Sequence, residues 1–113
     1  MSTDTHSGTP TEPISITDRA ELDSVISTHG VVLVDFYADW CGPCRMMEST
    51  IDAVAAETDA AVVKVNVDRL QPLAAEFGVQ AVPTLIVFND GEPTERMAGM
   101  QTREALERAI ATR

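Results

Sequence analysis

Short apolar runs recur along the chain, and the segments between them carry apolar residues at helical spacing. Residues 31–38 (VVLVDFYA) and 61–67 (AVVKVNV) consist largely of consecutive β-branched and aromatic residues, which is typical of strands buried on both faces. A third run covers residues 84–88, directly after Pro83, where a strand tolerates proline because no hydrogen bond from its nitrogen is needed. We therefore predict three central strands from these runs.

Four helices are predicted before, between and after these strands. Asp18 followed by Glu21 is a capping-box pattern, and it starts a helix that should end at His29-Gly30. A short helix opens at Gln71-Pro72, with proline near its first position, and Thr102 caps the last helix. The long helix that follows residue 44 is indicated by an apolar stripe made of Met46, Met47, Ile51, Val54 and Ala55.

A short first strand at residues 14–16 and a hairpin complete the pattern. Asp90-Gly91 is a strong turn signal, and residues 93–98 would form the returning strand. The predicted order β-α-β-α-β-α-β-β-α combines parallel crossover units with a terminal antiparallel hairpin. We expect an α/β fold with a central mixed sheet flanked by helices on both faces. Residues 1–13 offer nothing to bury, so a disordered polar tail should precede a domain over residues 14–113.

Composition and charge exclude several classes of function. The 113 residues carry 18 acidic and 8 basic side chains, for a net charge of −10, so the basic footprint of a nucleic-acid-binding protein is missing. Apolar runs stay far below the roughly 18 residues that a membrane span needs. The first residues have no basic region followed by an apolar one. We therefore expect a cytoplasmic protein that binds neither nucleic acid nor membrane.

The acidic side chains also indicate something about the source. Seven of the eight basic residues are arginine, and only Lys64 is lysine. Dense carboxylates with almost no lysine favour adaptation to high salt, where screening removes the self-repulsion of an acidic surface. An acidic domain from an ordinary environment stays open as the alternative.

The only two cysteines, Cys41 and Cys44, are separated by two residues and lie where a predicted strand meets the long helix. Thiols at this spacing can close a small disulfide ring, and in a reducing compartment such a pair is more often catalytic or metal-binding than structural. A zinc site needs about four ligands, and His6 and His29 are too scattered to complete one. A structural disulfide is weaker still, because so short a loop yields little stabilisation. A reversible dithiol–disulfide couple is therefore the leading hypothesis, without metal or cofactor.

Asp35 interrupts the first buried strand and is the most informative residue outside the cysteine pair. Burial disfavours the charged carboxylate, so its pKa should rise toward neutrality, which suits a general acid or base near pH 7. A bulged or solvent-facing aspartate without a role stays open as the alternative.

Residues 34–44 (VDFYADWCGPC) resemble the signature of the thioredoxin family almost letter for letter. Val82-Pro83-Thr84 is similar to the cis-proline site of that family, and Gly99 falls where the family keeps a glycine beside its active site. The resemblance covers residues 14–113 and implies a thioredoxin fold. The implied function is protein disulfide reduction by thiol–disulfide exchange through a Cys41–Cys44 couple.

The resemblance also implies a division of labour. Cys41 would be the exposed nucleophile, since the start of a helix favours a thiolate, a generalisation for which thioredoxins are themselves a standard example. Cys44 would resolve the mixed disulfide, and Pro43 would stiffen the loop. Asp35 would exchange a proton with Cys44 through a water. Lys64 would pair with Asp35, unless its stem packs while the ammonium reaches water.

A docking surface for the substrate is implied beside the cysteines. Backbone groups of Val82 would pair with an extended substrate segment, and small apolar residues would surround it. The implied substrate-binding residues are Trp40, Gly42, Pro43, Val82, Pro83 and Gly99. Ser49 and Ala81 depart from the family, which often has proline and glycine there. The first predicts a kink in the long helix that is either weaker or carried by other contacts, and the second an altered choice of partner.

The implied partners are disulfide-containing protein substrates and a thioredoxin reductase or equivalent electron donor, with the chain acting as a monomer. The Gly-Pro pair between the cysteines is more similar to reductants than to other members of the fold. Two alternatives stay open. The first is a disulfide oxidase or isomerase of the same fold, and the second is a non-catalytic subunit that uses the fold only for binding.

Overall fold

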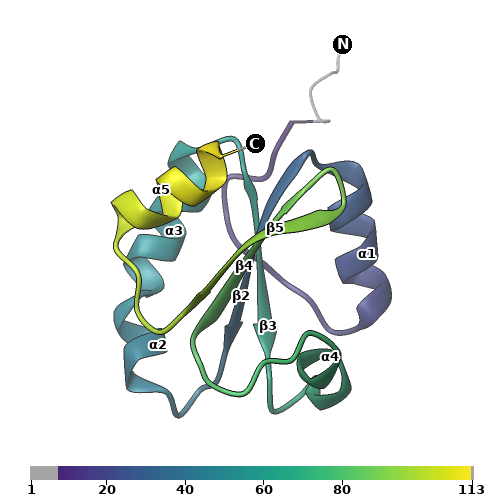
Figure 1. The fold of residues 1–113 in the computed structure, drawn as a ribbon, viewed down its shortest axis with the longest axis vertical. Coiled ribbons are helices and arrows are strands. Elements are labelled where there is room, and N and C mark those ends of the chain that lie inside the picture. Colours follow the sequence, from purple (N-terminus) through teal and green to yellow (C-terminus); the bar gives the residue numbers. More distant parts are fainter. Residues whose placement is uncertain (1–7, 113) are drawn as a thin grey trace.

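A computed structural model describes residues 8–112 of the chain. A central sheet runs through the molecule, with helices on either side of it (Figure 1). The elements in chain order are β1 (Ile14–Ser15), α1 (Arg19–Thr28), β2 (Val31–Tyr37), α2 (Gly42–Met46), α3 (Glu48–Glu57), β3 (Ala61–Asn66), α4 (Gln71–Glu76), β4 (Thr84–Asn89), β5 (Glu92–Ala98) and α5 (Arg103–Ala111).

The sheet has five strands in the order β1-β3-β2-β4-β5. β1 and β2 pair with β3 in parallel, whereas β4 pairs antiparallel with both β2 and β5. The sheet is therefore mixed, as predicted, with the parallel part built by crossovers through helices and the antiparallel part by a hairpin. The turn of that hairpin lies at Asp90 and Gly91, both with positive φ (49° and 86°), as the Asp-Gly pair predicts.

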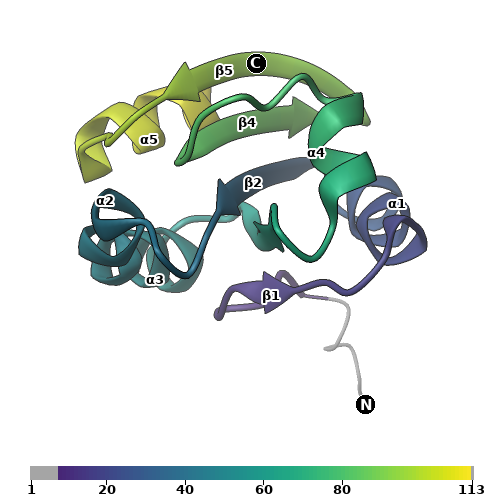
Figure 2. The same ribbon diagram turned by 90° about the horizontal axis from the view of Figure 1, so that it is seen from below.

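Two apolar clusters cover the two faces of the sheet. α2, α3 and α5 lie over one face, and α1 and α4 lie over the other (Figure 2). Alternate residues of β2 enter the two clusters: Leu33 packs with residues of α3 and α5, whereas Val34 and Phe36 pack with Leu22 of α1 and Leu73 of α4. This alternation follows from the two-residue period of a strand, and it explains why the run at residues 31–38 is apolar throughout.

The predicted helix starts are confirmed at the level of single hydrogen bonds. The carboxylate of Asp18 accepts from the backbone N–H of Glu21 (2.9 Å), and the hydroxyl of Thr102 accepts from that of Ala105 (3.1 Å). One detail of the capping box differs, because the Glu21 carboxylate accepts from the N–H of Thr17 and not from that of Asp18. These caps satisfy backbone donors that the first helical turn leaves without partners.

The long helix predicted after residue 44 is divided in two at Met47. The N–H of Met47 donates to the carbonyls of Pro43 and Cys44, and regular bonding resumes with Ile51 donating to Met47 (2.8 Å). The break thus lies two residues before Ser49, at the step between α2 and α3. Placing Met46 on the inner stripe was wrong, since 70% of its surface is exposed. Cys44, Met47 and Ile51 follow each other at spacings of three and four on the buried face, which leaves Met46 on the opposite side.

The predicted tail is described only from residue 8. Residues 8–13 contain neither strand nor helix, and the hydroxyl of Thr9 donates to the carbonyl of Asp59 (3.3 Å). The prediction for the preceding residues, His6 included, lies outside the described residues. Within residues 8–112, none of the helices combines the length and the apolar character needed to cross a membrane.

Candidate active site

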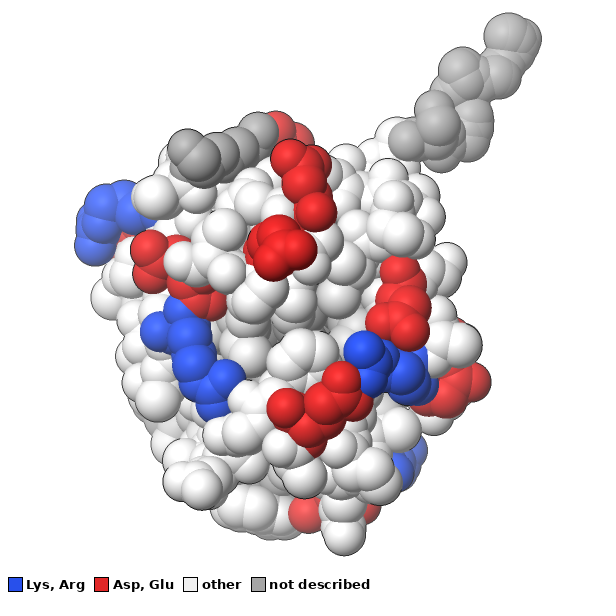
Figure 3. Space-filling view, turned by 45° about the vertical axis from the view of Figure 1, so that its right-hand side comes forward, with Lys and Arg blue, Asp and Glu red and all other residues white. Residues whose placement is uncertain are grey.

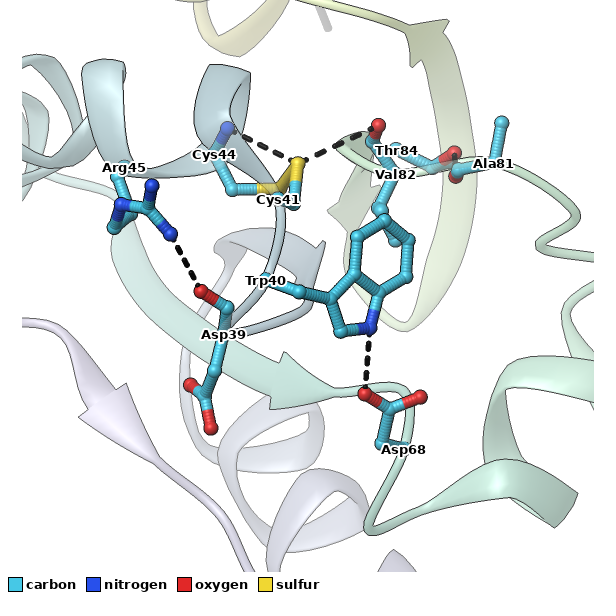
Figure 4. Close-up of a disulfide and its surroundings, with 9 residues drawn as sticks. All are labelled: Asp39, Trp40, Cys41, Cys44, Arg45, Asp68, Ala81, Val82 and Thr84. Atoms are coloured by element: carbon cyan, nitrogen blue, oxygen red, sulfur yellow. Dashed lines mark hydrogen bonds between the residues drawn. A yellow bond between two sulfur atoms is a disulfide. The ribbon is translucent and has the colours of Figure 1, made fainter.

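The cysteine pair lies where β2 gives way to α2, at one end of the sheet (Figures 1 and 4). Cys41 is the N-cap of α2 and Cys44 lies within its first turn. The two are joined by a disulfide, with their Cα atoms 5.3 Å apart, well inside the range that a disulfide bridges. The C-x-x-C pair is therefore placed to cycle between dithiol and disulfide.

The sulfur of Cys41 has two polar neighbours. The backbone N–H of Cys44 donates to it at 3.1 Å, and the carbonyl oxygen of Val82 lies 3.7 Å away (Figure 4). A donor aimed at this sulfur stabilises negative charge on it. Pro43, which has no N–H of its own, occupies the turn between Cys41 and Cys44. The N–H of Cys44 thus favours a thiolate on Cys41 in the reduced form.

The exposure predicted for Cys41 was wrong for this disulfide form. Only 3% of Cys41 is exposed, against 7% of Cys44. Both pack with Ala38 in a small cluster, against which Val67 and Val82 also lie. Apolar side chains from two further loops cover the disulfide, so the sequence position of Cys41 at the start of a helix does not decide its exposure.

The segment before β4 brings the predicted proline to the disulfide. The Val82–Pro83 peptide is cis, as the family resemblance implies. The N–H of Gly99 donates to the carbonyl of Pro83 (2.8 Å), with Gly99 itself at φ 85°, a conformation that favours glycine. The hydroxyl of Thr84 donates to the carbonyl of Ala81 (2.6 Å). These bonds hold the proline segment against β5 and next to Cys41.

A groove of about 120 Å³ lies beside the disulfide, and one of its walls is the indole of Trp40, which is 68% exposed. The indole Nε1 donates to the carboxylate of Asp68 (2.9 Å), which holds the ring in place (Figure 4). Of the predicted docking residues, the groove unites Trp40 and Val82, whereas Gly42, Pro43, Pro83 and Gly99 lie outside its lining. The groove is lined by Trp40, Val67, Val79, Gln80, Ala81 and Val82.

Several of these groove residues were missed by sequence reasoning. Val67 and Val79 read as strand and loop residues with no chemical signal, and Asp68 as one carboxylate among many. Beyond the predicted Trp40 and Val82, only Ala81 was noted, because it departs from the family pattern. The side chain of Asn66 accepts from the N–H groups of Asp68 and Arg69 (3.0 and 3.2 Å), a local turn that presents Asp68 to Trp40. Asn66 at the end of a predicted strand is therefore the sequence signal that could have indicated the position of Asp68.

Asp35 is buried, as predicted, with 5% of its surface exposed. It pairs in register with Lys64 on β3 and Leu85 on β4, and it faces the layer of α2 and α3. Burial raises the pKa of Asp35 to about 6, which the charge of Lys64 partly offsets and that of Glu48 reinforces. A carboxyl group with this pKa can both donate and accept a proton near neutral pH.

Lys64 acts on Asp35 without a direct ion pair. Within the described residues, the ion pairs closer than 4.0 Å do not include these two side chains. The ammonium of Lys64 lies 4.5 Å from the centre of the Tyr37 ring instead, which is a cation–π distance. The predicted pairing is thus replaced by a longer-range effect, although Lys64 still lowers the pKa of Asp35.

A polar cavity of about 70 Å³ adjoins Cys44, enough for about two water molecules. Its walls include Glu48 and Lys64, the two charges that act on Asp35. Glu48, the first residue of α3, lies four residues after Cys44 of α2. The cavity thus brings Cys44 together with two charged groups that the sequence did not connect.

A wider hollow of about 530 Å³ lies at the end of α1, beside the β4–β5 turn, and its lining includes none of the predicted site residues. The volume of a cavity therefore does not indicate where the active site lies in this molecule. The two cysteines, the raised pKa of Asp35 and the adjoining groove define the site of a thiol–disulfide oxidoreductase.

Comparisons with known proteins agree with this class. The family model described as Thioredoxin matches residues 13–112. The chain is 41% identical over 100 residues to a thioredoxin of Mycobacterium tuberculosis strain H37Rv, covering 87% of this chain and 86% of that protein. It is 43% identical over 95 residues to a thioredoxin of Staphylococcus epidermidis, covering 82% and 89%. The chain belongs to the thioredoxin family, whose members are protein-disulfide oxidoreductases.

Solved structures show the same relationship. A mutant thioredoxin from the halophile Halobacterium salinarum NRC-1 is 50% identical, with a TM-score of 0.89 and 91% of each chain covered. A Schistosoma mansoni thioredoxin is 31% identical, with a TM-score of 0.82 and coverage of 91% of this chain and 96% of that one. The thioredoxin fold that the family resemblance implied is confirmed.

Proposed function

We propose that this chain reduces protein disulfides, with Cys41 as the attacking and Cys44 as the resolving thiol. The Cys41 thiolate attacks one sulfur of a substrate disulfide, forming a mixed disulfide and releasing the other substrate sulfur as a thiolate. Cys44 then attacks the Cys41 sulfur, closing the Cys41–Cys44 disulfide and releasing the second substrate thiol. The observation that carries this order is the Cys44 N–H aimed at the Cys41 sulfur, because it stabilises the thiolate on Cys41.

Asp35 is proposed to receive the proton that Cys44 must lose before it attacks. Its raised pKa, about 6, supports this role, because the carboxylate form is available at neutral pH and is basic enough to take a proton. The cavity beside Cys44 has room for a relaying water. Lys64 supports the step by keeping a share of Asp35 ionised.

The docking surface proposed for the substrate spans the groove and the proline segment. An extended substrate segment would pair with the backbone of Val82, next to Pro83 and the Cys41 sulfur, while apolar side chains lie against Trp40. Gly42, Pro43 and Gly99 would border this contact with little side-chain bulk. Ala81 lines the groove where relatives often have glycine, so its methyl group would influence the choice of partner.

The partners proposed are disulfide-containing proteins and a thioredoxin reductase or equivalent donor that returns two electrons to the Cys41–Cys44 disulfide. We place this reaction in the cytoplasm, carried out by a monomer, with residues 14–113 as the catalytic domain. The strongly acidic composition and the resemblance to a halophile thioredoxin support adaptation to multimolar salt.

An insulin-reduction assay tests the function. The wild-type chain, recharged by dithiothreitol, should precipitate reduced insulin chains, and Cys41→Ser should abolish the activity. Cys44→Ser should instead accumulate a mixed disulfide with the substrate, because attack proceeds and resolution does not. Retained activity of Cys41→Ser would contradict the assignment. Full function of the double serine variant in the cell would favour a binding subunit.

Redox equilibration with glutathione separates reductant from oxidase. A reductant stays oxidised at thiol–disulfide ratios where a disulfide oxidase is already reduced, because its potential is more negative. Equilibration at the ratio typical of an oxidase would favour that alternative. The same samples, melted from low to multimolar KCl, test salt adaptation, since screening of the acidic surface should raise the midpoint of unfolding.

A further inference from the structure

The arginines of this acidic chain contact partners of different kinds. Arg19 contacts the carboxylates of Asp23 and Glu76. Arg103 contacts those of Glu57 and Glu107. On the face shown in Figure 3, basic side chains likewise adjoin acidic ones. Arg96 differs, because its guanidinium donates to two backbone carbonyls.

Arg96 lies on β5 opposite Ile86, on the face of the sheet that α4 covers. Its two terminal nitrogens donate to the carbonyls of Phe77 (2.6 Å) and Gly78 (2.8 Å). Within residues 8–112, no carboxylate lies within 4.0 Å of this guanidinium. Cations suit the carbonyl end of a helix, and a planar fork reaches two carbonyls at once.

The bonded carbonyls mark the point where α4 ends and the docking segment begins. Gly78 turns the chain with a φ of 67°, and the N–H of Val79 donates back to the carbonyl of Ala74 (2.9 Å). The next four residues, 79–82, all line the groove beside Trp40. At its other end the segment is tied to β5 again, through Gly99 and the carbonyl of Pro83.

The opposite wall of the groove has a contact of the same kind. Arg45 donates to the carbonyl of Asp39 (2.8 Å), one residue before Trp40 (Figure 4). Both walls are therefore held by guanidinium groups bonded to backbone carbonyls at the points where the chain enters them.

We propose that Arg96 is a positioning residue for substrate docking, which fixes the course of residues 79–83 by holding the carbonyls of Phe77 and Gly78 from β5. The proposal rests on the proposed function, since that function makes this segment a substrate contact. Arg96 is remote from the sulfur chemistry, so it should affect the binding of protein substrates and not the reactivity of the thiols.

Kinetics with two substrates of different size test the proposal. Arg96→Ala should raise the KM for a protein disulfide about fivefold, because charged hydrogen bonds of moderate net strength are lost. Its kcat, and its rate with a small aromatic disulfide that does not need the groove, should stay near those of the wild type. Arg96→Lys keeps the charge but lacks the planar guanidinium that reaches both carbonyls, so its KM should lie between those of the wild type and Arg96→Ala.

Arg108→Ala is the matched control, because it removes the same charge from an exposed position in the last turn of α5. It should leave both rates unchanged. An unchanged KM in Arg96→Ala would overturn the proposal, as would an equal loss of rate with both substrates, which indicates general damage to the fold. If Arg96→Ala does not fold, the KM of Arg96→Lys for the protein disulfide tests the proposal instead: a raised KM supports it, and a wild-type KM overturns it.

Amide hydrogen exchange separates this proposal from the proposed function. The N–H of Val79 should exchange faster in Arg96→Ala and Arg96→Lys than in the wild type and Arg108→Ala. Unchanged exchange would overturn the positioning role even if insulin is reduced. A wild-type chain that is inactive on protein disulfides would overturn the proposed function and leave the exchange result to judge Arg96.

Discussion

Two consecutive residues of β2, Asp35 and Phe36, are buried to nearly the same degree on opposite faces of the sheet. Phe36 is fully covered, with the ring of Phe77 5.8 Å away, and it belongs to an entirely apolar cluster. Asp35 is 5% exposed, yet it brings a carboxyl group under α2 and α3. The buried cluster on one face is therefore entirely apolar, whereas the other face carries a titratable group at the end where the disulfide lies.

The difference shows how the fold combines stability with chemistry. Burial of Phe36 stabilises the folded state at every pH, because no charge is involved. Burial of Asp35 costs free energy whenever the carboxyl is ionised, and the same cost raises its pKa to about 6. The strand that supplies much of the core thus also holds a destabilising residue, and that residue is the one suited to proton transfer.

Replacing Phe36 should have the largest effect. Phe36→Ala removes a fully buried ring of β2 that lies next to Phe77 at the end of α4, so the free energy of unfolding should fall by about 3–5 kcal/mol, equally at pH 4 and pH 7. Urea denaturation at both pH values measures this. A cost that depends strongly on pH would mean that the two faces are not independent.

Asp35→Asn should act in the opposite direction. The folded pKa of about 6 lies above the ordinary value of 3.8, so the native state holds its proton more tightly and wild-type stability falls as pH rises through this window. Asparagine removes that loss, which amounts to about 3 kcal/mol above pH 6 and vanishes near about pH 3. Denaturation across this range checks it, and a constant gain would point to another cause.

The same substitution should slow disulfide exchange. Without a group to accept the proton of Cys44, insulin reduction should fall by about 100-fold at neutral pH, while the wild-type rate titrates near the pKa of Asp35. Stopped-flow kinetics across the pH range measures both. Wild-type turnover in the asparagine variant would remove the catalytic role proposed for Asp35.

Lys64→Met should have a smaller effect on the polar face. Of the two charges that act on Asp35, Lys64 has the larger effect and lowers the pKa of Asp35. Its removal should therefore shift the titration of Asp35 to higher pH and increase the loss of stability at neutral pH. Carbon-detected NMR titration of the Asp35 carboxyl follows the shift. A shift to lower pH would contradict the charge effect.

Glu48→Gln should have the smallest effect. Glu48 raises the pKa of Asp35 and is exposed, so screening limits its influence. The titration of Asp35 should move to lower pH, and less so in multimolar KCl. Asp52→Asn, a charge change on the same helix, serves as the control and should leave the titration unmoved.

Much of the fold could be predicted because its signals are local. The capping residues Asp18 and Thr102, the turn at Asp90-Gly91 and the apolar runs each act over a few residues, and the structure confirms them. The break at Met47 and the exposure of Met46 could not, because both depend on how α2 is seated on the sheet. The helical periodicity of the sequence does not predict how α2 packs on the sheet.

The site divides in the same way. The spacing of Cys41 and Cys44 and the aspartate in a buried run were readable from the chain, since both follow from covalent proximity and local pattern. The sequence by itself therefore determined the class of chemistry and the order of the elements.

Only the tertiary structure decided what surrounds that chemistry. It covers Cys41 with residues from distant loops, directs Lys64 onto Tyr37 instead of Asp35, and assembles a groove from segments 40, 67 and 79–82. Arg96 acquires its carbonyl partners in the same way. The physical reason is that burial, desolvation and hydrogen bonding between segments far apart in the chain depend on where the sheet brings those segments together, which no local pattern records.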